Sequence, residues 1–71
     1  MEEAKQDAPV GTVEEVLPNS LFRIRMPDGS LILSYLAGKM RLHRIRVLVG
    51  DRVELVLDPY GGRARIVRRL S

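Results

Sequence analysis

The chain contains 71 residues, with twelve Lys or Arg against nine Asp or Glu, 45% hydrophobic residues and no cysteine. This length allows one small domain, and the lack of cysteine excludes a disulfide framework and a thiolate metal site. Because small secreted domains usually depend on disulfides, we expect a cytoplasmic protein. We also expect no bound metal or cofactor.

Residues 1–9 are expected to form a flexible, solvated leader before a single domain at residues 10–71. The leader carries three carboxylates against one lysine and lacks the apolar core of a signal peptide. The most apolar stretch, Leu31–Gly38, is much shorter than the roughly 20 residues that cross a bilayer. We therefore expect no membrane contact.

Apolar residues recur at every second position along most of this domain, which is typical of β-strands. The first strand is predicted over Val10–Leu17, where Gly11 is expected to mark a bend or bulge. A turn is predicted over residues 17–20. The second strand is predicted over Leu21–Met26, with arginines on its outer face. Its buried face would carry Phe22, Ile24 and Met26.

Pro27 and Gly29 predict a turn before the third strand, which is expected at Leu31–Leu36. This strand is apolar on both faces apart from Ser34, which suits a position in the middle of a small barrel. Tyr35 could lie on either face of it.

The alternation stops over residues 37–48, where a turn or two of helix is predicted at Lys39–Leu42. The inward face of this helix would carry Met40 and His43, and its outward face Arg41 and Arg44.

Two more strands complete the chain. The fourth is predicted over Arg52–Leu57, after a turn at residues 49–51, and its buried face would carry Val53, Leu55 and Leu57. The fifth is predicted over Arg63–Leu70, beyond a loop at residues 58–62 that contains Pro and two Gly. Its buried positions would be Ala64 and Ile66.

Five short strands with a small helix between the third and the fourth predict an all-β fold, the five-stranded OB-fold β-barrel. An SH3-like barrel is the structural alternative, because it also builds five strands from a similar length. The long interval between the third and fourth strands favours the OB-fold.

Charge is distributed unevenly along the chain. Residues 1–20 carry five acids against one lysine, whereas residues 21–71 carry eleven bases against four acids. Two acid-free runs, residues 39–46 and 63–69, hold four cations each, and ten of the twelve bases are Arg. Because guanidinium groups make paired contacts with phosphates, a polyanionic partner is favoured over a merely solvated basic surface.

The residues that catalysis needs are scarce. The chain has no Cys and one His, and none of its four serines lies in a nucleophile motif. His43, within a basic run, is more typical of a surface or half-packed residue than of a catalyst, and it is a poor basis for a metal site. We therefore expect that the protein is not an enzyme.

Three aromatic residues are too few for the stacking platform of a general single-strand-binding protein. Phe22 is expected in the core, and Tyr60, in a Pro-Tyr-Gly-Gly loop, is the clearest candidate for an exposed ring. Arginine-rich loops instead favour folded RNA, whose shape, phosphates and splayed bases they contact.

Three segments together carry the pattern of a known family. They are Leu17-Pro18-Asn19-Ser20-Leu21-Phe22-Arg23, the stretch from Gly38-Lys39-Met40-Arg41 to Gly50-Asp51, and Pro59-Tyr60 followed by Arg65-Ile66-Val67. With them the chain resembles bacterial translation initiation factor one. The resemblance implies a monomeric OB-fold protein that binds the 30S ribosomal subunit at the decoding A site, through 16S rRNA and beside ribosomal protein S12. Such a factor assists initiation factors two and three and blocks premature tRNA entry.

The resemblance also implies RNA-binding residues. Residues 39–41 with Arg46 would enter the groove of an RNA stem and hold displaced decoding adenines, while Tyr60 and Arg65 would face RNA near the closing strand. Relative to the family pattern, Leu42-His43-Arg44 replaces Lys-Asn-Tyr. The full predicted set is Lys39, Met40, Arg41, His43, Arg44, Arg46, Tyr60, Arg63, Arg65 and Arg69.

Two other functions stay open from the residues alone. A cold-shock-like chaperone of single-stranded RNA would bind unstructured oligonucleotides and would depend on Tyr35 or Tyr60. A structural or protein-interaction barrel, in which the arginines only form a soluble face, would not bind 30S subunits.

Overall fold

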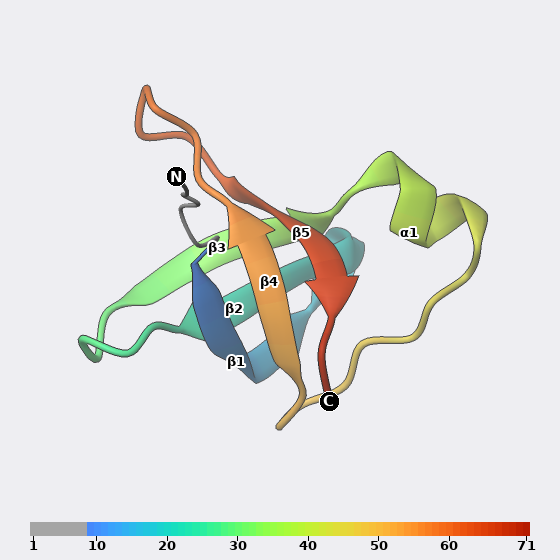
Figure 1. Cartoon of the computed structure of the whole chain (residues 1–71), viewed down its shortest axis with the longest axis horizontal. Coiled ribbons are helices and arrows are strands. Elements are labelled where there is room, and N and C mark those ends of the chain that lie inside the picture. Colours follow the sequence, from blue (N-terminus) through green and yellow to red (C-terminus); the bar gives the residue numbers. More distant parts are fainter. Residues whose placement is uncertain (1–8) are drawn as a thin grey trace, which may run out of the picture.

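The computed structural model describes residues 9–71, so the predicted leader, apart from Pro9, lies outside the described residues. Figure 1 shows the strands wrapped into a barrel, with the segment between the third and fourth strands projecting from one side. The elements are β1 (Val10–Leu17), the 3-10 turn η1 (Pro18–Ser20), β2 (Leu21–Arg25), β3 (Leu31–Leu36), α1 (Gly38–Leu42), β4 (Arg52–Val56) and β5 (Ala64–Arg69).

The strands close in the order β1-β2-β3-β5-β4, because β4 returns to pair with β1. Neighbouring strands are antiparallel except β3 and β5, which run parallel. β1 belongs to two ladders, and Thr12 is the partner of both Arg25 in β2 and Arg52 in β4. This closed order, with a helix between β3 and β4, is that of the OB-fold and confirms the predicted fold class.

The barrel interior is filled from alternate positions of the strands, as the period of two requires. The predictions that Phe22, Ala64 and Ile66 are buried are confirmed, with exposed fractions of 5%, 3% and 0%. Fully burying one branched or aromatic side chain of this kind contributes about 1.5–3 kcal/mol. The core cluster comprises Val13, Phe22, Ile24, Met40, Val47, Val53, Leu55 and Ile66.

The β2–β3 turn is determined by its local sequence. The carboxylate of Asp28 accepts hydrogen bonds from the hydroxyl of Ser30 at 2.6 Å and from its N–H at 2.9 Å, and these bonds hold the pKa of Asp28 below its ordinary value. Gly29 has a φ of +88°, a conformation that side chains rarely adopt. The N–H of Met26 then donates to the carbonyl of Ser30 at 2.8 Å and closes the turn.

Two predicted details of the strands are wrong. Leu57 is predicted to face inward, but β4 ends at Val56 and Leu57 is 49% exposed. The bulge predicted at Gly11 lies instead between Val13 and Glu15, where the β1–β2 register shifts. Gly11 serves close packing, because a Cβ at this position would overlap the side chain of Ile24.

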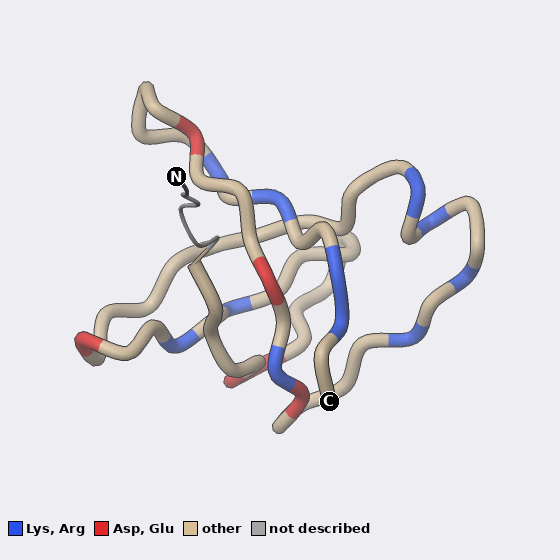
Figure 2. Tube along the Cα trace, in the orientation of Figure 1, with Lys and Arg blue, Asp and Glu red and all other residues tan. Residues whose placement is uncertain are grey.

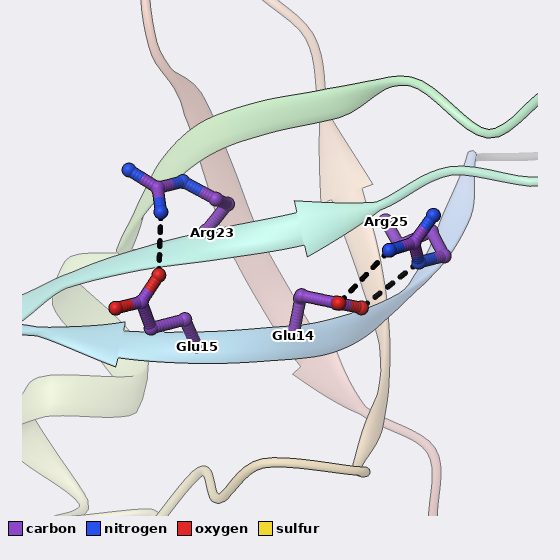
Figure 3. Close-up of polar contacts among 4 residues, drawn as sticks. All are labelled: Glu14, Glu15, Arg23 and Arg25. Carbon is purple, nitrogen blue, oxygen red and sulfur yellow. Dashed lines mark hydrogen bonds and ion pairs between the residues drawn. The ribbon is translucent and has the colours of Figure 1, made fainter.

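The outer face of β1 and β2 carries opposite charges at neighbouring positions, since Glu15 in β1 is the register partner of Arg23 in β2. Figure 2 marks the charged positions along the chain. Arg25 donates two hydrogen bonds to Glu14, from Nε at 2.9 Å and from Nη2 at 2.8 Å, and Arg23 pairs with Glu15 (Figure 3). These hydrogen bonds lower the pKa of Glu14 and raise the pKa of Arg25. These exposed pairs neutralise this face rather than stabilise it strongly.

β5 carries two more ion pairs near its end. Nε of Arg68 lies 3.7 Å from Oε1 of Glu54 in β4, and Nε of Arg69 lies 3.3 Å from Oδ2 of Asp51. Within residues 9–71, four of the six arginines in the strands therefore have an acidic partner. Among the same residues, Arg52 and Arg65 are the strand arginines without an acidic partner.

Replacing Ser34 by alanine is expected to preserve or raise stability. Ser34 is 0% exposed and its hydroxyl has no hydrogen-bond partner among residues 9–71, so the folded state bears the cost of desolvating it. Removing such a group gains up to about 1 kcal/mol in the free energy of unfolding. Urea unfolding measures this difference. Ile66→Val in the same core should instead lower the free energy of unfolding by about 0.5–1.5 kcal/mol. An equal decrease in Ser34→Ala would contradict this interpretation.

Replacing Glu14 by glutamine should remove a pH-dependent part of the stability. Because the folded pKa of Glu14 is lowered, its pair with Arg25 stabilises the fold above the ordinary glutamate pKa of about 4.3 and is lost as the pH falls through the folded pKa. The melting temperatures of the parent and Glu14→Gln should therefore differ slightly at neutral pH and converge in acid. Arg25→Gln should show the same convergence. A difference that persists at the acid end would contradict this account.

Candidate nucleic-acid interface

The segment between β3 and β4 is tied to the barrel at both ends. At its start, the N–H of Ala37 donates to a β5 carbonyl at 2.8 Å, and the side chain of Met40 packs into the core. At its end, the N–H of Gly50 donates to the carbonyl of Val13, and the N–H of Val13 donates to the carbonyl of Asp51, each at 2.9 Å. The residues between these anchors are held in a defined position.

The backbone reverses direction directly after α1. The N–H of His43 donates to a carbonyl one turn back at 3.0 Å, and Arg44 has a φ of +55°, which carries the chain out of the helix. The N–H of Ile45 then donates to the carbonyl of Met40 at 3.0 Å. Val47 returns to the core with 6% of its surface exposed.

Residues 38–48, named here the basic loop, carry a group of exposed cations. Lys39, Arg41, Arg44 and Arg46 are all exposed, and none has an ion pair among the residues that the structure describes. Figure 2 shows the Lys and Arg positions distributed around this loop, away from the barrel. Within the described part of the chain, the basic loop therefore presents positive charge without an acidic partner on an anchored backbone.

Two predictions for the basic loop differ in outcome. Met40 is 1% exposed, which confirms that it faces inward, so its side chain anchors α1 in the core and is not on the surface with the other predicted site residues of the loop. His43 is predicted to face inward but is exposed. The helix ends at Leu42, and His43 already has a non-helical backbone, so it falls outside the inward face.

The β4–β5 loop is organised by one carboxylate. Asp58 accepts hydrogen bonds from the N–H of Tyr60 at 2.9 Å and from the N–H of Gly62 at 3.0 Å. A Cβ at Gly62 would overlap this carboxylate, which explains why glycine occupies the position. The ring of Tyr60 is 93% exposed, as predicted for this loop.

The predicted contact residues form two groups rather than one compact site. The basic loop and the β4–β5 loop project from different sides of the barrel (Figure 1), and the first part of β5 lies between them. Arg63, just before β5, and Arg65, within it, are exposed and have no ion pair within residues 9–71. Arg69 is also exposed but pairs with Asp51.

The sequence alone does not determine which face of its strand Tyr35 occupies. Tyr35 is 39% exposed on the outer face of β3, because the neighbouring Ser34 points into the core. A strand that is apolar on both faces gives no alternation from which the outward residues could be identified.

Over residues 9–71 there is no group of three or more His, Cys, Asp or Glu side chains that could hold a metal ion. Over the same residues, no helix is long and apolar enough to cross a membrane.

Comparison with known proteins supports a translational role for this barrel. The sequence model of the family described as translation initiation factor 1A / IF-1 matches residues 1–71. The solution structure of translation initiation factor one from the Wolbachia endosymbiont strain TRS of Brugia malayi is 34% identical, with a TM-score of 0.72, over 87% of this chain and 75% of that one.

Two larger proteins contain a similar barrel. YjeQ from Thermotoga maritima is 33% identical with a TM-score of 0.74, but the match covers 89% of this chain and 22% of YjeQ. YloQ, a circularly permuted GTPase, is 15% identical with a TM-score of 0.76, and the match covers 100% of this chain and 25% of YloQ. This similarity is one of fold alone.

The family match spans every described element, including the basic loop and the β4–β5 loop. Its members are translation initiation factors and not enzymes, which agrees with the prediction made from the absent catalytic residues. The chain belongs to the translation initiation factor 1A / IF-1 family.

Proposed function

We propose that this protein is a cytoplasmic initiation factor that binds the 30S ribosomal subunit at the decoding A site through 16S rRNA. It would act there as a monomer beside ribosomal protein S12, assist initiation factors two and three, and block premature entry of tRNA. Residues 10–71 would be the RNA-binding domain, and residues 1–9 a leader that precedes it.

The charge of the basic loop is the observation that carries this proposal. Its four cations lie within eight residues and have no acidic partner among residues 9–71, whereas Arg23, Arg25, Arg68 and Arg69 are paired with carboxylates on the barrel. A polyanion that approaches the barrel therefore finds its strongest attraction at this loop. Arginines at the tip of a projecting loop reach phosphates in a groove that a flat sheet face would not enter.

The anchoring of the loop supports recognition of a folded RNA. Met40 and Val47 are buried and anchor the backbone that carries the cations at two points. A preorganised loop loses little conformational entropy on binding and matches one RNA shape better than others. A long, flexible basic tail would instead bind any polyanion.

The double variant Arg41→Ala/Arg46→Ala should bind 30S subunits at least about a hundredfold more weakly, because each charged hydrogen bond contributes about 1.5–3 kcal/mol. Co-sedimentation with 30S subunits at moderate salt measures the change. The matched control is Arg23→Ala/Arg25→Ala, which removes the same charge from the paired face of β2. Affinity that is unchanged in the first variant, or equally weak in both, would contradict the assignment to the basic loop.

The salt dependence of binding should separate phosphate contacts from general attraction. Each phosphate contact contributes about 0.7–0.9 to the slope of log K against log salt concentration. The Arg41→Ala/Arg46→Ala variant should therefore have a slope shallower by about 1.4–1.8. A slope equal to that of the parent chain would mean that neither arginine contacts a phosphate on the subunit.

Chemical probing would test the location on the subunit. Addition of the parent chain to 30S subunits should protect decoding-site adenines from base-specific probes, and the Arg41→Ala/Arg46→Ala variant should not protect them at the same concentration. Protection confined to another region of the 16S rRNA would contradict the A-site assignment while leaving 30S binding itself intact.

A further inference from the structure

Three outward-facing side chains form a row across adjacent strands of the barrel. Tyr35 in β3 is the register partner of Arg65 in β5, and Arg65 is the partner of Val56 in β4. Tyr35 is 39% and Val56 42% exposed, and Arg65 is exposed between them. Because neighbouring strands lie about 4.8 Å apart, the ring, the guanidinium and the aliphatic side chain lie next to one another.

This row is the floor of a small groove of about 240 Å³. The end of β4 and the β4–β5 loop form its other side, so that the groove combines an aromatic ring, apolar carbon and two guanidinium groups. Its lining residues are Tyr35, Val56, Leu57, Asp58, Pro59, Arg63 and Arg65.

The charges in this groove favour an anionic ligand. Arg63 and Arg65 have no ion pair among residues 9–71, in contrast to the arginines of β2 and the last residues of β5. The one acid in the lining, Asp58, already accepts hydrogen bonds from the backbone N–H groups of Tyr60 and Gly62. Its carboxylate holds the loop in shape, and the two guanidinium groups remain for the ligand.

The groove also continues the proposed RNA surface. Tyr35 lies two residues before Ala37, whose N–H is bonded to the carbonyl of Ile66 in β5, so the groove adjoins the base of the basic loop. An RNA segment that leaves the basic loop toward the β4–β5 loop would pass over Arg65.

We propose that this groove, named here the Tyr35 groove, binds one unstacked nucleotide of the bound RNA. The base would stack on the ring of Tyr35 and against Val56, and Arg63 and Arg65 would contact its phosphates. A nucleotide combines a flat aromatic face with an adjacent anion, and the groove offers an aromatic ring beside two guanidinium groups that have no ion pair among residues 9–71. The inference rests on the proposed function and adds Tyr35 to the predicted contacts.

NMR titration of the full chain tests this directly. The chain has one Phe, two Tyr and no Trp, so the ring signals of Tyr35 and Tyr60 can be followed separately in one spectrum. A tetranucleotide of adenylate should shift the Tyr35 ring signals upfield and saturably, because a stacked base shields the ring. The same backbone without bases should not produce this shift.

Two variants of equal charge provide the control. Arg65→Ala should weaken the binding measured at the Tyr35 ring by about tenfold. Arg52→Ala removes an exposed arginine of β4 that lies outside the groove. It should change the affinity measured at the Tyr35 ring less than twofold. Equal weakening in both variants would mean general attraction of the polyanion and would overturn the proposal.

A parallel 30S co-sedimentation of the parent chain separates this inference from the proposed function. Unshifted Tyr35 signals in a chain that binds 30S subunits would overturn the groove proposal and leave the proposed function standing. A saturable Tyr35 shift in a chain that does not bind 30S subunits would support the groove and overturn the proposed function. Tighter binding of free phosphotyrosine than of adenylate would identify a protein ligand and overturn the groove proposal.

Discussion

The parallel pairing of β3 with β5 is the constraint on which the rest of the molecule depends. Two parallel neighbours cannot be joined by a tight turn, so the chain must cross over between them. Here the crossover contains the basic loop, which includes α1, and then β4. β4 then pairs with both β5 and β1 and closes the barrel. The basic loop is thus the connection that barrel closure itself requires.

Closure also determines how firmly this loop is held. The backbone bond from Ala37 to β5 and the bonds between residues 50–51 and Val13 fix its ends, while Met40 and Val47 fill the core beneath it. A barrel of this size has few core positions, so these two side chains matter to both stability and loop position. The same contacts that complete the core therefore also anchor the backbone that carries the exposed cations.

Ion pairing on the barrel concentrates the available charge. Carboxylates in β1, in β4 and just before β4 neutralise arginines in β2 and β5, and the basic loop has no such partner within the described residues. Similar barrels occur in YjeQ and YloQ, which are much longer chains. Because one fold hosts many functions, the topology of the barrel does not by itself identify what this chain does.

Much of the fold and part of the site can be predicted from the sequence. Alternating apolar residues and turn residues such as Pro27 and Gly29 identify the five strands, because they reflect local backbone preferences and the two-residue period of a strand. The acid-free run at residues 39–46 likewise predicts a basic segment. These features depend on residues close together in the chain. For them, the structure adds only the positions at which the strands end.

The remaining features were decided by contacts between distant segments. The sequence could not assign Tyr35 to a face, since β3 is apolar on both sides, and it could not identify Glu14 as the partner of Arg25 without the β1–β2 register. It placed Leu57 inward because the pattern continues beyond the end of β4. Only the paired strands determine which cations are neutralised and which remain exposed, because ion pairing depends on distances across the barrel and not along the chain.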